Sequence, residues 1–386
     1  MSARHPVILP GSTIGILGGG QLGRMTALAA RQMGYRVAVL TDDADSPAAQ
    51  TADYILAGSF TDTGLIDQLA ACSDVITIEF ENIPNAALAW LEARLPAHPS
   101  SVILRISQNR LDEKESLQRI GVPTTAFAAV RGPGDHEEAA LVTGFPAFLK
   151  TTAGGYDGKG QIYCADRSEL TAADRQLAGS GTPRILEAAV PFVKELSVVV
   201  ARNHTGRART YPVIENEHRN KILHLSIAPA RVPEAVARRA ENLAVQIAQE
   251  LSLTGVMAIE MFLTADGQIL VNEMAPRPHN SGHLTLDAAY TSQFEQHVRA
   301  VCGLPLGSPG LHSAAVMLNL LGEHLAGALG RLQGILGDPG LSLHLYGKAD
   351  ARPGRKMGHL CALGDDAADA LVRAGRAWDR VMGGSP

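Results

Sequence analysis

The apolar positions of the first hundred residues alternate between short continuous runs and helical spacing. The runs at 13–18, 35–40 and 73–80 read as buried strands, and the segment 21–33 carries apolar residues at helical spacing. Strands that alternate with helices are typical of a parallel sheet covered by helices. The pattern therefore predicts an α/β domain over residues 1–105.

The pattern changes after residue 105. The stretch "NRLDEKESLQRIGVP" predicts a helix that Gly121 ends, and residues 145–275 are rich in strand and hairpin signals. One amphipathic helix is expected over 234–251. Its core positions are Val236, Ala240, Leu243, Ala244 and Ile247. We expect an α+β domain over 106–300 and a small C-terminal domain over 301–386.

A glycine-rich turn, "GGGQLG" at 18–23, joins the first strand to the first helix. It fits the GxGxxG pattern, and Asp42 and Asp43 follow about 20 residues on, as in dinucleotide-binding sites. The motif is weak alone, because glycines that open a helix after a strand also bind other phosphates, or bind nothing. A nicotinamide-dependent enzyme is one hypothesis.

A second glycine-rich stretch, "TTAGGYDGKGQ" at 151–161, follows the apolar run "FPAFLK". Glycines at this density suit a backbone that wraps a phosphate, with Lys150 and Lys159 supplying positive charge. The alternative is a mobile hairpin. The stretch alone does not decide between them.

Two carboxylates are predicted to face each other in the segment "GVMAIEMFLTADGQILVNEM". Asp266-Gly267 is a strong signal for a two-residue type I′ hairpin, and that register places Glu260 opposite Glu273. Like charges in an apolar hairpin repel. Either one glutamate is protonated, or a bulge turns one aside, or a divalent cation lies between them. Strict alternation would turn Asn272 to the other face.

Composition limits the classes of ligand. The chain is 46% apolar and 19% charged with a net charge of −5, which argues against general nucleic-acid binding. Its four cysteines show no metal-site spacing, and a reducing cytoplasm is the simplest location. No apolar stretch reaches the ~18 residues of a membrane span. A cluster of Arg277, His279, Asn280 and His283 follows Glu273, and together with the glycine-rich loop and the carboxylates it implies Mg²⁺-dependent phosphoryl transfer from ATP.

At these residues the sequence resembles the ATP-grasp superfamily, and within it the N5-carboxyaminoimidazole ribonucleotide synthetases. The motifs "GGGQLGRM", "EFENIP", "GGYDGKGQ", "VKELSVVVAR", "NEMAPRPHNSGH" and "YGKADARPGRKMGH" occur in the family's order over nearly the whole chain. The resemblance implies an ATP-grasp fold with a Rossmann-like N-terminal domain, a flexible loop over 154–161 and a small C-terminal domain. It also implies a cytoplasmic homodimer without nucleic-acid or membrane partners.

The implied reaction joins bicarbonate to 5-aminoimidazole ribonucleotide through carboxyphosphate, with ATP and Mg²⁺, or Mn²⁺, as cofactors. Glu260 and Glu273 match the metal ligands, and Tyr156, Asp157, Arg277 and His279 match catalytic positions. The implied ATP contacts are Arg105, Lys150, Gly155, Tyr156, Asp157, Gly158, Lys159, Gly160, Gln161, Glu187, Ala188, Ala189, Val190, Glu195, His218, Asn272 and Glu273. The implied contacts to the ribonucleotide and bicarbonate are Gln21, Glu79, Asn280, Ser281, Lys348, Arg355 and Lys356.

Two other hypotheses remain. An ATP-grasp ligase of another substrate would share the nucleotide half of the chain but not "EFEN" and "RPHNSGH". A nicotinamide-dependent oxidoreductase would rest on "GGGQLG" and Asp42, and it leaves the pair of Glu260 and Glu273 unexplained.

Overall fold

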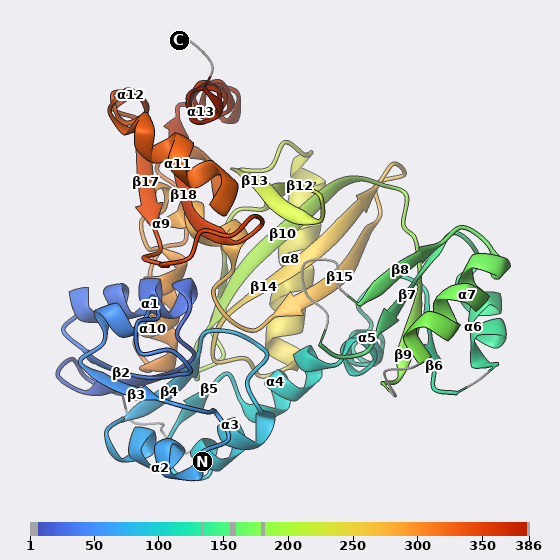
Figure 1. The fold of residues 1–386 in the computed structure, drawn as a ribbon, viewed down its shortest axis with the longest axis horizontal. Coiled ribbons are helices and arrows are strands. Elements are labelled where there is room, and N and C mark those ends of the chain that lie inside the picture. The colour runs from blue at the N-terminus through green and yellow to red at the C-terminus, as the bar shows by residue number, and fades with distance from the viewer. Residues whose placement is uncertain (1–6, 133, 155–159, 179–181, 384–386) are drawn as a thin grey trace.

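Three β-sheets organise the chain (Figure 1). The computed structural model describes residues 7–132, 134–154, 160–178 and 182–383. No helix in these ranges combines the length and the apolar character that a membrane span requires.

The first sheet is parallel throughout, with the strand order β3-β2-β1-β4-β5, as the alternating pattern predicts. Its strands are β1 (Thr13–Leu17), β2 (Arg36–Thr41), β3 (Tyr54–Ala57), β4 (Val75–Ile78) and β5 (Ala97–His98). The helical elements of this part are α1 (Gln21–Gln32), η1 (Ala49–Thr51), α2 (Thr63–Ala71), α3 (Asn85–Glu92) and α4 (Ser101–Gln108). The apolar face of β1 and β2 packs on α1 and on a helix from the middle of the chain, α10 (Gln293–Val301). The N-terminal sheet is thereby fixed to the rest of the molecule.

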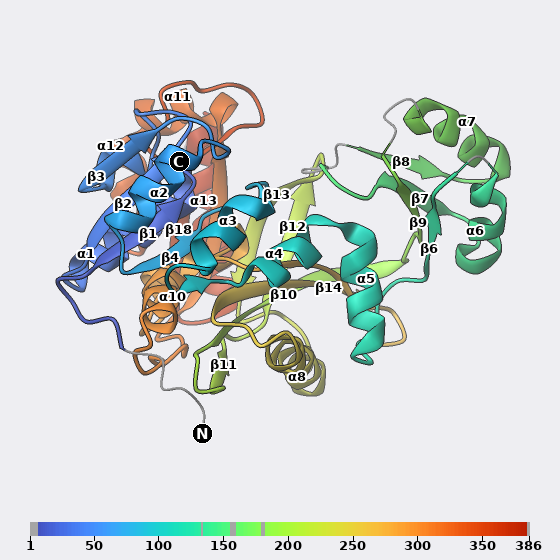
Figure 2. The same cartoon turned by 90° about the horizontal axis from the view of Figure 1, so that it is seen from below.

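The second sheet is the largest and is antiparallel, in the order β15-β14-β10-β12-β13-β16-β18-β17, with β11 beside β10. Its strands from the middle of the chain are β10 (Phe192–Arg202), β11 (Ala208–Thr210), β12 (Ile214–Arg219), β13 (Ile222–Ala228), β14 (Gly255–Thr264) and β15 (Ile269–Ala275). One long helix, α8 (Glu234–Glu250), lies beneath it (Figure 2). Val236, Ala240, Ala244 and Ile247 of α8 are buried in the core and Leu243 packs beside them, which confirms the amphipathic helix.

The third sheet forms a separate lobe with the strand order β6-β9-β7-β8. Its strands are β6 (Phe127–Val130), β7 (Ala147–Thr151), β8 (Gln161–Cys164) and β9 (Arg184–Ala188). Two helices, α6 (Asp135–Thr143) and α7 (Arg167–Ala178), pack on one face of it. A further helix, α5 (Arg110–Arg119), lies between this lobe and the central sheet (Figure 1).

The C-terminal segment continues the central sheet, because β16 pairs with β13. Its strands are β16 (Ala314–Leu321), β17 (Leu341–Leu345) and β18 (Lys356–Gly364), and its helices are α11 (Gly322–Gly330), α12 (Leu332–Leu336) and α13 (Ala367–Met382). Before it come η2 (Asn280–Leu284) and α9 (Thr285–Ala288). The middle and C-terminal segments therefore share one sheet, while each packs its own helices on it.

The hairpin of β14 and β15 corrects one detail of the prediction. Glu260 does pair with Glu273, but the turn is not the two-residue type I′ turn. The Thr264 N–H donates to the Gln268 carbonyl at 3.0 Å, and only Gly267 of the turn has positive φ, at 82°. The strands therefore start one residue out of the predicted register, and a bulge between Val271 and Glu273 restores it.

Candidate functional site

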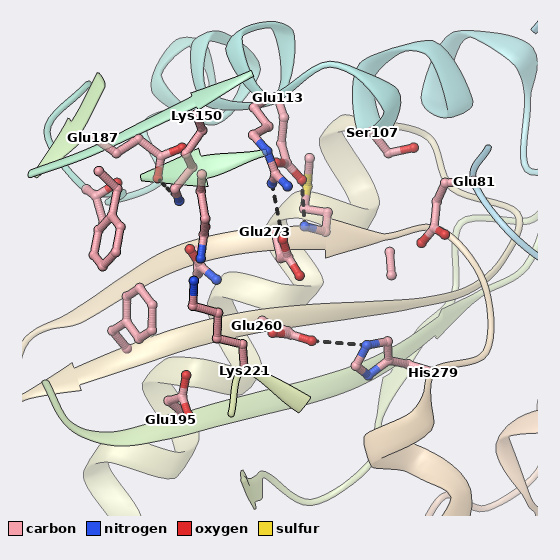
Figure 3. A pocket seen from close by; sticks show the side chains of 18 of the residues that line it. Glu81, Ser107, Glu113, Lys150, Glu187, Glu195, Lys221, Glu260, Glu273 and His279 are labelled. Atoms are coloured by element: carbon pink, nitrogen blue, oxygen red, sulfur yellow. Dashed lines mark hydrogen bonds and ion pairs between the residues drawn. The ribbon is translucent and has the colours of Figure 1, made fainter. Parts of the chain in front are cut away.

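A cleft of about 630 Å³ lies between the central sheet and the small lobe (Figure 3). Its walls come from β7 and β9 on one side, from β10, β12, β14 and β15 on the other, and from α5. The cleft gathers most of the predicted site residues from positions far apart in the chain. Those that line it are Lys150, Gln161, Glu187, Ala188, Val190, Glu195, His218, Glu260, Asn272, Glu273, Arg277, His279, Asn280 and Lys356.

The two predicted metal ligands lie directly opposite each other on β14 and β15, and Figure 3 shows them on the same face of the sheet. Glu260 Oε1 lies 3.0 Å from His279 Nε2, and Glu273 Oε2 lies 3.6 Å from Arg110 Nη1. Burial disfavours ionisation of Glu260, but the hydrogen bond from His279 holds its pKa below the ordinary value. Burial and then the charge of Glu260 raise the pKa of Glu273. Opposite shifts of this kind are typical of two carboxylates that share a site.

The bulge in β15 explains why Asn272 also lines the cleft. Lys114 Nζ donates to the Asn272 carbonyl at 2.7 Å, and Glu113 Oε1 accepts from the Met274 N–H at 2.6 Å. These two neighbours on α5 satisfy backbone groups at the irregularity, so the extra residue is held in place. Asn272 and Glu273 can therefore both contribute to the cleft, which strict alternation excludes. Two carboxylates and one amide are hard oxygen donors, and this donor set fits Mg²⁺.

The lysine predicted at the end of "FPAFLK" is paired. Lys150 Nζ, on β7, donates to Glu187 Oε2, on β9, at 2.8 Å. Lys114, which is fully buried, lies 3.8 Å from the same carboxylate. Burial opposes ionisation of Glu187, but the charges of Lys114 and Lys150 lower its pKa overall. At this end of the cleft, two lysines of like charge are therefore held together by one buried carboxylate, Glu187.

Glu195 and His218, both predicted nucleotide contacts, contact each other. Their side chains lie 2.7 Å apart across β10 and β12. Burial would lower the pKa of His218, but the hydrogen bond to Glu195 raises it overall. Close by in the lining, Phe192 and Phe262 stack with ring centroids 4.7 Å apart. These apolar rings, together with Phe148, offer a surface for a flat heterocycle, and no sequence motif signalled them.

Arg105, a predicted ATP contact, does not line the cleft. It lies in the last turn of α4, is exposed, and pairs with Asp112 at 3.2 Å outside the cleft. Arg110, five residues later and at the start of α5, lines the cleft beside Glu273 instead. Asn109 caps α5 by accepting from Leu111 and Asp112 N–H groups, and this cap places Arg110 in the first turn.

The other side of the cleft carries the residues after Glu273. Arg277 Nη2 pairs with Glu81 of the "EFEN" motif at 2.7 Å. Asn280 is 7% exposed, and neither polar atom of its side chain has a hydrogen-bond partner. A buried amide without partners is costly in an apolar setting, so it is suited to contact a ligand in the cleft. Ser281 is fully buried and bonds Ser197 rather than lining the cleft.

Besides Arg105 and Ser281, six predicted ribonucleotide or nucleotide contacts among the described residues lie beyond the lining of this cleft: Gln21, Glu79, Gly160, Ala189, Lys348 and Arg355. Lys348 Nζ donates to the Lys356 carbonyl, and Arg355 Nη1 donates to the Asp350 carbonyl, each at 2.8 Å. The Ala189 N–H donates to the Pro146 carbonyl at 2.9 Å. Gln21 begins α1 in the N-terminal sheet. Lys356 is the residue of the basic C-terminal segment that reaches the lining.

Glu79 explains the glycines of "GGGQLG". Its carboxylate accepts from the Gly20 N–H at 2.8 Å and from the Gly23 N–H at 3.3 Å, at the N-terminus of α1. A Cβ on Gly18 would lie 2.2 Å from the Glu79 side chain. The turn is therefore packed against a carboxylate that already occupies the helix N-terminus, where a dinucleotide pyrophosphate would need to bind. This arrangement contradicts the nicotinamide hypothesis.

Five loop residues predicted to contact ATP or substrate, Gly155, Tyr156, Asp157, Gly158 and Lys159, lie outside the described residues. Next to them, Gly160 has a φ of 71°, a conformation that favours glycine, and Gln161 lines the cleft.

A separate cluster joins Asp287, His344 and His359 near β17 and β18. The two imidazole rings are stacked, with centroids 4.6 Å apart and an interplanar angle of 17°. Lone pairs in nearly parallel ring planes do not converge on one point, and Asp287 Oδ2 lies 2.9 Å from His344 Nε2. This cluster is a hydrogen-bonded pair, Asp287 and His344, stacked on His359, rather than a good metal site.

Comparisons with known proteins place the whole chain in one family. Family models match residues 11–108 as a ribonucleotide synthetase preATP-grasp domain, 115–294 as an ATP-grasp domain, and 315–373 as a phosphoribosylaminoimidazole carboxylase C-terminal domain. The chain is 45% identical over 382 residues to the N5-carboxyaminoimidazole ribonucleotide synthase of Bacillus subtilis. The aligned region covers 98% of each protein.

Solved structures agree with the sequence comparison. An ADP complex of an N5-carboxyaminoimidazole ribonucleotide synthetase superimposes with a TM-score of 0.93 at 47% identity, over 98% of this chain and 100% of that one. The synthase of Aspergillus clavatus in complex with ADP and 5-aminoimidazole ribonucleotide gives 0.88 at 32% identity, over 96% and 98%. The protein therefore belongs to the N5-carboxyaminoimidazole ribonucleotide synthase family of ATP-grasp enzymes.

Proposed function

We propose that this protein uses ATP to carboxylate 5-aminoimidazole ribonucleotide with bicarbonate, giving N5-carboxyaminoimidazole ribonucleotide, ADP and phosphate in purine biosynthesis. One observation carries the proposal: the chain matches, along nearly its whole length, a synthase whose structure holds ADP and 5-aminoimidazole ribonucleotide together. The alternative of an ATP-grasp ligase for another substrate is not favoured, because the match includes the C-terminal domain of the carboxylase.

The chemistry accounts for the charges in the cleft. Bicarbonate is a poor electrophile. An oxygen of bicarbonate attacks the γ-phosphorus of ATP, the bond from this phosphorus to the bridging oxygen breaks, and ADP leaves with that electron pair. The carboxyphosphate then loses phosphate as the amine of the ribonucleotide binds the carboxyl carbon and gives up a proton. Positioning and electrostatic stabilisation dominate such transfers.

The geometry of the cleft supports the proposed nucleotide contacts. Lys150 and Arg110 are assigned to the phosphates, because both are cations that line the cleft. The stacked pair of Phe192 and Phe262 offers one apolar surface to the base, and Glu195 accepts from the ribose hydroxyls. Backbone groups of 187–190 read the adenine edge.

Glu260, Glu273 and Asn272 would hold Mg²⁺, with Mn²⁺ as a substitute. The bound cation would neutralise charge that develops on the transferring phosphoryl group. The chain's own contribution is to keep both carboxylates on one face, through the bulge in β15 and the hydrogen bond from His279 to Glu260.

The ribonucleotide and bicarbonate are assigned to the opposite end of the cleft. Asn280 offers a buried amide without partners, and Arg277 and Lys356 supply positive charge. Lys348 and Arg355 extend this cationic side, and Gln21 and Glu79 lie at the start of α1. Tyr156 and Asp157, outside the described residues, complete the proposed set.

A homodimer and a cytoplasmic location are part of the proposal. The dimer rests on the family resemblance alone. A reducing compartment is supported by the four cysteines, which are all free thiols.

Oxygen transfer tests the reaction. With bicarbonate labelled by ¹⁸O, one labelled oxygen should appear in the phosphate that is released, because that oxygen forms the bond to phosphorus. Unlabelled phosphate during carboxylation would contradict a carboxyphosphate intermediate.

A further inference from the structure

A buried chain of hydrogen bonds lies beside Glu260, on the same face of the central sheet, and ends at His279. Ser226 Oγ donates to Asn216 Oδ1 at 2.7 Å, and Asn216 Nδ2 donates to Ser197 Oγ at 2.9 Å. Ser197 Oγ donates to Ser281 Oγ at 2.8 Å, and Ser281 Oγ lies 2.9 Å from His279 Nδ1. Ser197, Ser226 and Ser281 are fully buried, and Asn216 is 6% exposed.

The strand register explains why these polar groups meet. Ser197 on β10 lies directly opposite Glu260 on β14, and Ser226 on β13 lies directly opposite Asn216 on β12. Directly opposed residues of antiparallel strands share a face of the sheet. A polar row therefore crosses the sheet from Glu260 to Ser226. The short helix η2 covers this row and supplies Ser281.

The direction of the chain can be deduced. The serines can each donate or accept, and an amide can be turned over, so these four groups alone permit two opposite directions. The Ser281 backbone N–H favours one direction, because it donates to His279 Nδ1 in a long hydrogen bond of 3.3 Å. In that direction the Ser281 hydroxyl, 2.9 Å away, also donates, and His279 Nδ1 is an acceptor.

An accepting Nδ1 leaves the ring hydrogen on Nε2. This is the atom that lies 3.0 Å from Glu260 Oε1. With the hydrogen there, the ring donates to the carboxylate. In the other tautomer, a lone pair on Nε2 would face the carboxylate and repel it.

We propose that a relay of four side chains, Ser226, Asn216, Ser197 and Ser281, fixes His279 as its Nε2–H tautomer. His279 then donates a hydrogen bond to Glu260 and so orients that carboxylate. These four are positioning residues. The proposal rests on the proposed function only where it gives Glu260 a part in turnover. The same bonds also satisfy buried polar groups, so a test must read the tautomer itself.

Asn216→Asp is the informative variant, because it keeps the shape of the side chain and removes its donor. A carboxylate at 216 accepts from both Ser226 and Ser197. Ser197 then has no hydrogen for Ser281, so Ser281 Oγ donates to Ser197. Its free lone pair then favours a hydrogen on His279 Nδ1, in competition with the long bond from the Ser281 N–H. We expect His279 to shift towards its Nδ1–H tautomer.

The readout is the ¹⁵N spectrum of the full-length protein labelled in histidine, with His279 assigned by its loss in His279→Gln. The wild type should show hydrogen on Nε2 only, and Asn216→Asp should show it on Nδ1. Ser197→Ala interrupts the relay. In that background, adding Asn216→Asp should not change the tautomer of His279 any further. Hydrogen on Nδ1 in the wild type, or an equal response to Asn216→Asp in both backgrounds, would overturn the proposal.

Turnover gives a second measurement. Asn216→Asp should lower kcat about tenfold with little change in the KM for ATP, as expected when a hydrogen bond to a charged group is lost. Ser46→Ala is the matched control, because it removes a buried hydroxyl that accepts from Thr41 and does not line the cleft, and it should behave as the wild type. Thermal melting of each variant identifies any loss of fold.

The two proposals can fail separately. If the wild type has no ribonucleotide-dependent ATP turnover while the tautomer responds as described, the relay stands and the proposed function fails. If Glu260→Gln abolishes turnover while the tautomer ignores Asn216→Asp, the function stands and the relay fails.

Discussion

Glu260 and Glu273 lie directly opposite each other on adjacent antiparallel strands, and both line the cleft. Each lies within ion-pair distance of a basic side chain, His279 for Glu260 and Arg110 for Glu273. Two opposed carboxylates destabilise a sheet unless another charge offsets them. This opposition is the physical reason for the proposal that a divalent cation binds between them.

Removing either charge should stop turnover without unfolding the protein. We expect Glu260→Gln and Glu273→Gln each to lower kcat by about 100-fold or more, since metal-assisted charge stabilisation contributes several kcal/mol. Steady-state rates over a Mg²⁺ titration measure this. Glu217→Gln on β12, an exposed change of the same kind, should have no effect. Wild-type rates in Glu260→Gln and Glu273→Gln would show that these glutamates do not bind a metal that turnover requires.

Arg110, and not Arg105, should be a nucleotide contact. Arg110→Ala should raise the KM for ATP about tenfold, because a charge-assisted contact to phosphate is lost. Arg105→Ala removes an equal charge from an exposed pair with Asp112 and should leave that KM unchanged. If the two variants behave alike, the structural assignment is wrong.

Lys348 should make binding of the ribonucleotide depend on pH. Burial, and then the charge of Arg355, lower the pKa of Lys348 to about 8. The lysine therefore loses its charge as pH rises through 8, and kcat/KM for 5-aminoimidazole ribonucleotide should fall above that pH. Lys348→Arg should extend the plateau to higher pH. A flat wild-type profile to pH ~9.5 would exclude this role, since free lysine titrates near 10.4.

Unfolding does not explain such a fall. Because the folded pKa of Lys348 lies below the unfolded value of 10.5, the unfolded chain binds more protons between pH 8 and 10.5. This group therefore adds to the free energy of unfolding as pH rises through that range.

Arg355 should serve the ribonucleotide and not ATP. Arg355→Ala should raise the KM for 5-aminoimidazole ribonucleotide about tenfold while leaving that for ATP nearly unchanged. Arg352 offers a control three residues away, since it pairs with Asp350 and its side chain is 69% exposed. An equal rise in both KM values, or the same effect in Arg352→Ala, would show that this segment is a solvated basic loop with no specific contact to the ribonucleotide.

The hairpin shows how far local sequence reasoning reaches. The Asp266-Gly267 signal placed the turn, and the pairing of Glu260 with Glu273 was correct. The register near the turn was wrong by one residue, and the bulge beside Asn272 compensated for it. That bulge is held by Glu113 and Lys114, which belong to a distant helix, so the hairpin sequence alone cannot reveal it.

Other features were local and were predicted well. Apolar periodicity located α1, α8 and the parallel sheet, because burial of one face decides both the pattern and the element. The errors arose where position depends on tertiary contacts. The sequence offers two arginines, Arg105 and Arg110, and only the turn between α4 and α5 decides which one reaches the cleft. The packing of Glu79 against the glycine turn is likewise a contact between residues 59 apart.

The most direct test of the account measures ADP release at fixed bicarbonate, with and without 5-aminoimidazole ribonucleotide, together with the carboxylated product. The account predicts that the ribonucleotide raises ADP release and that one N5-carboxyaminoimidazole ribonucleotide forms for each ADP. ADP release that is equal with and without the ribonucleotide, with no carboxylated product, would contradict it.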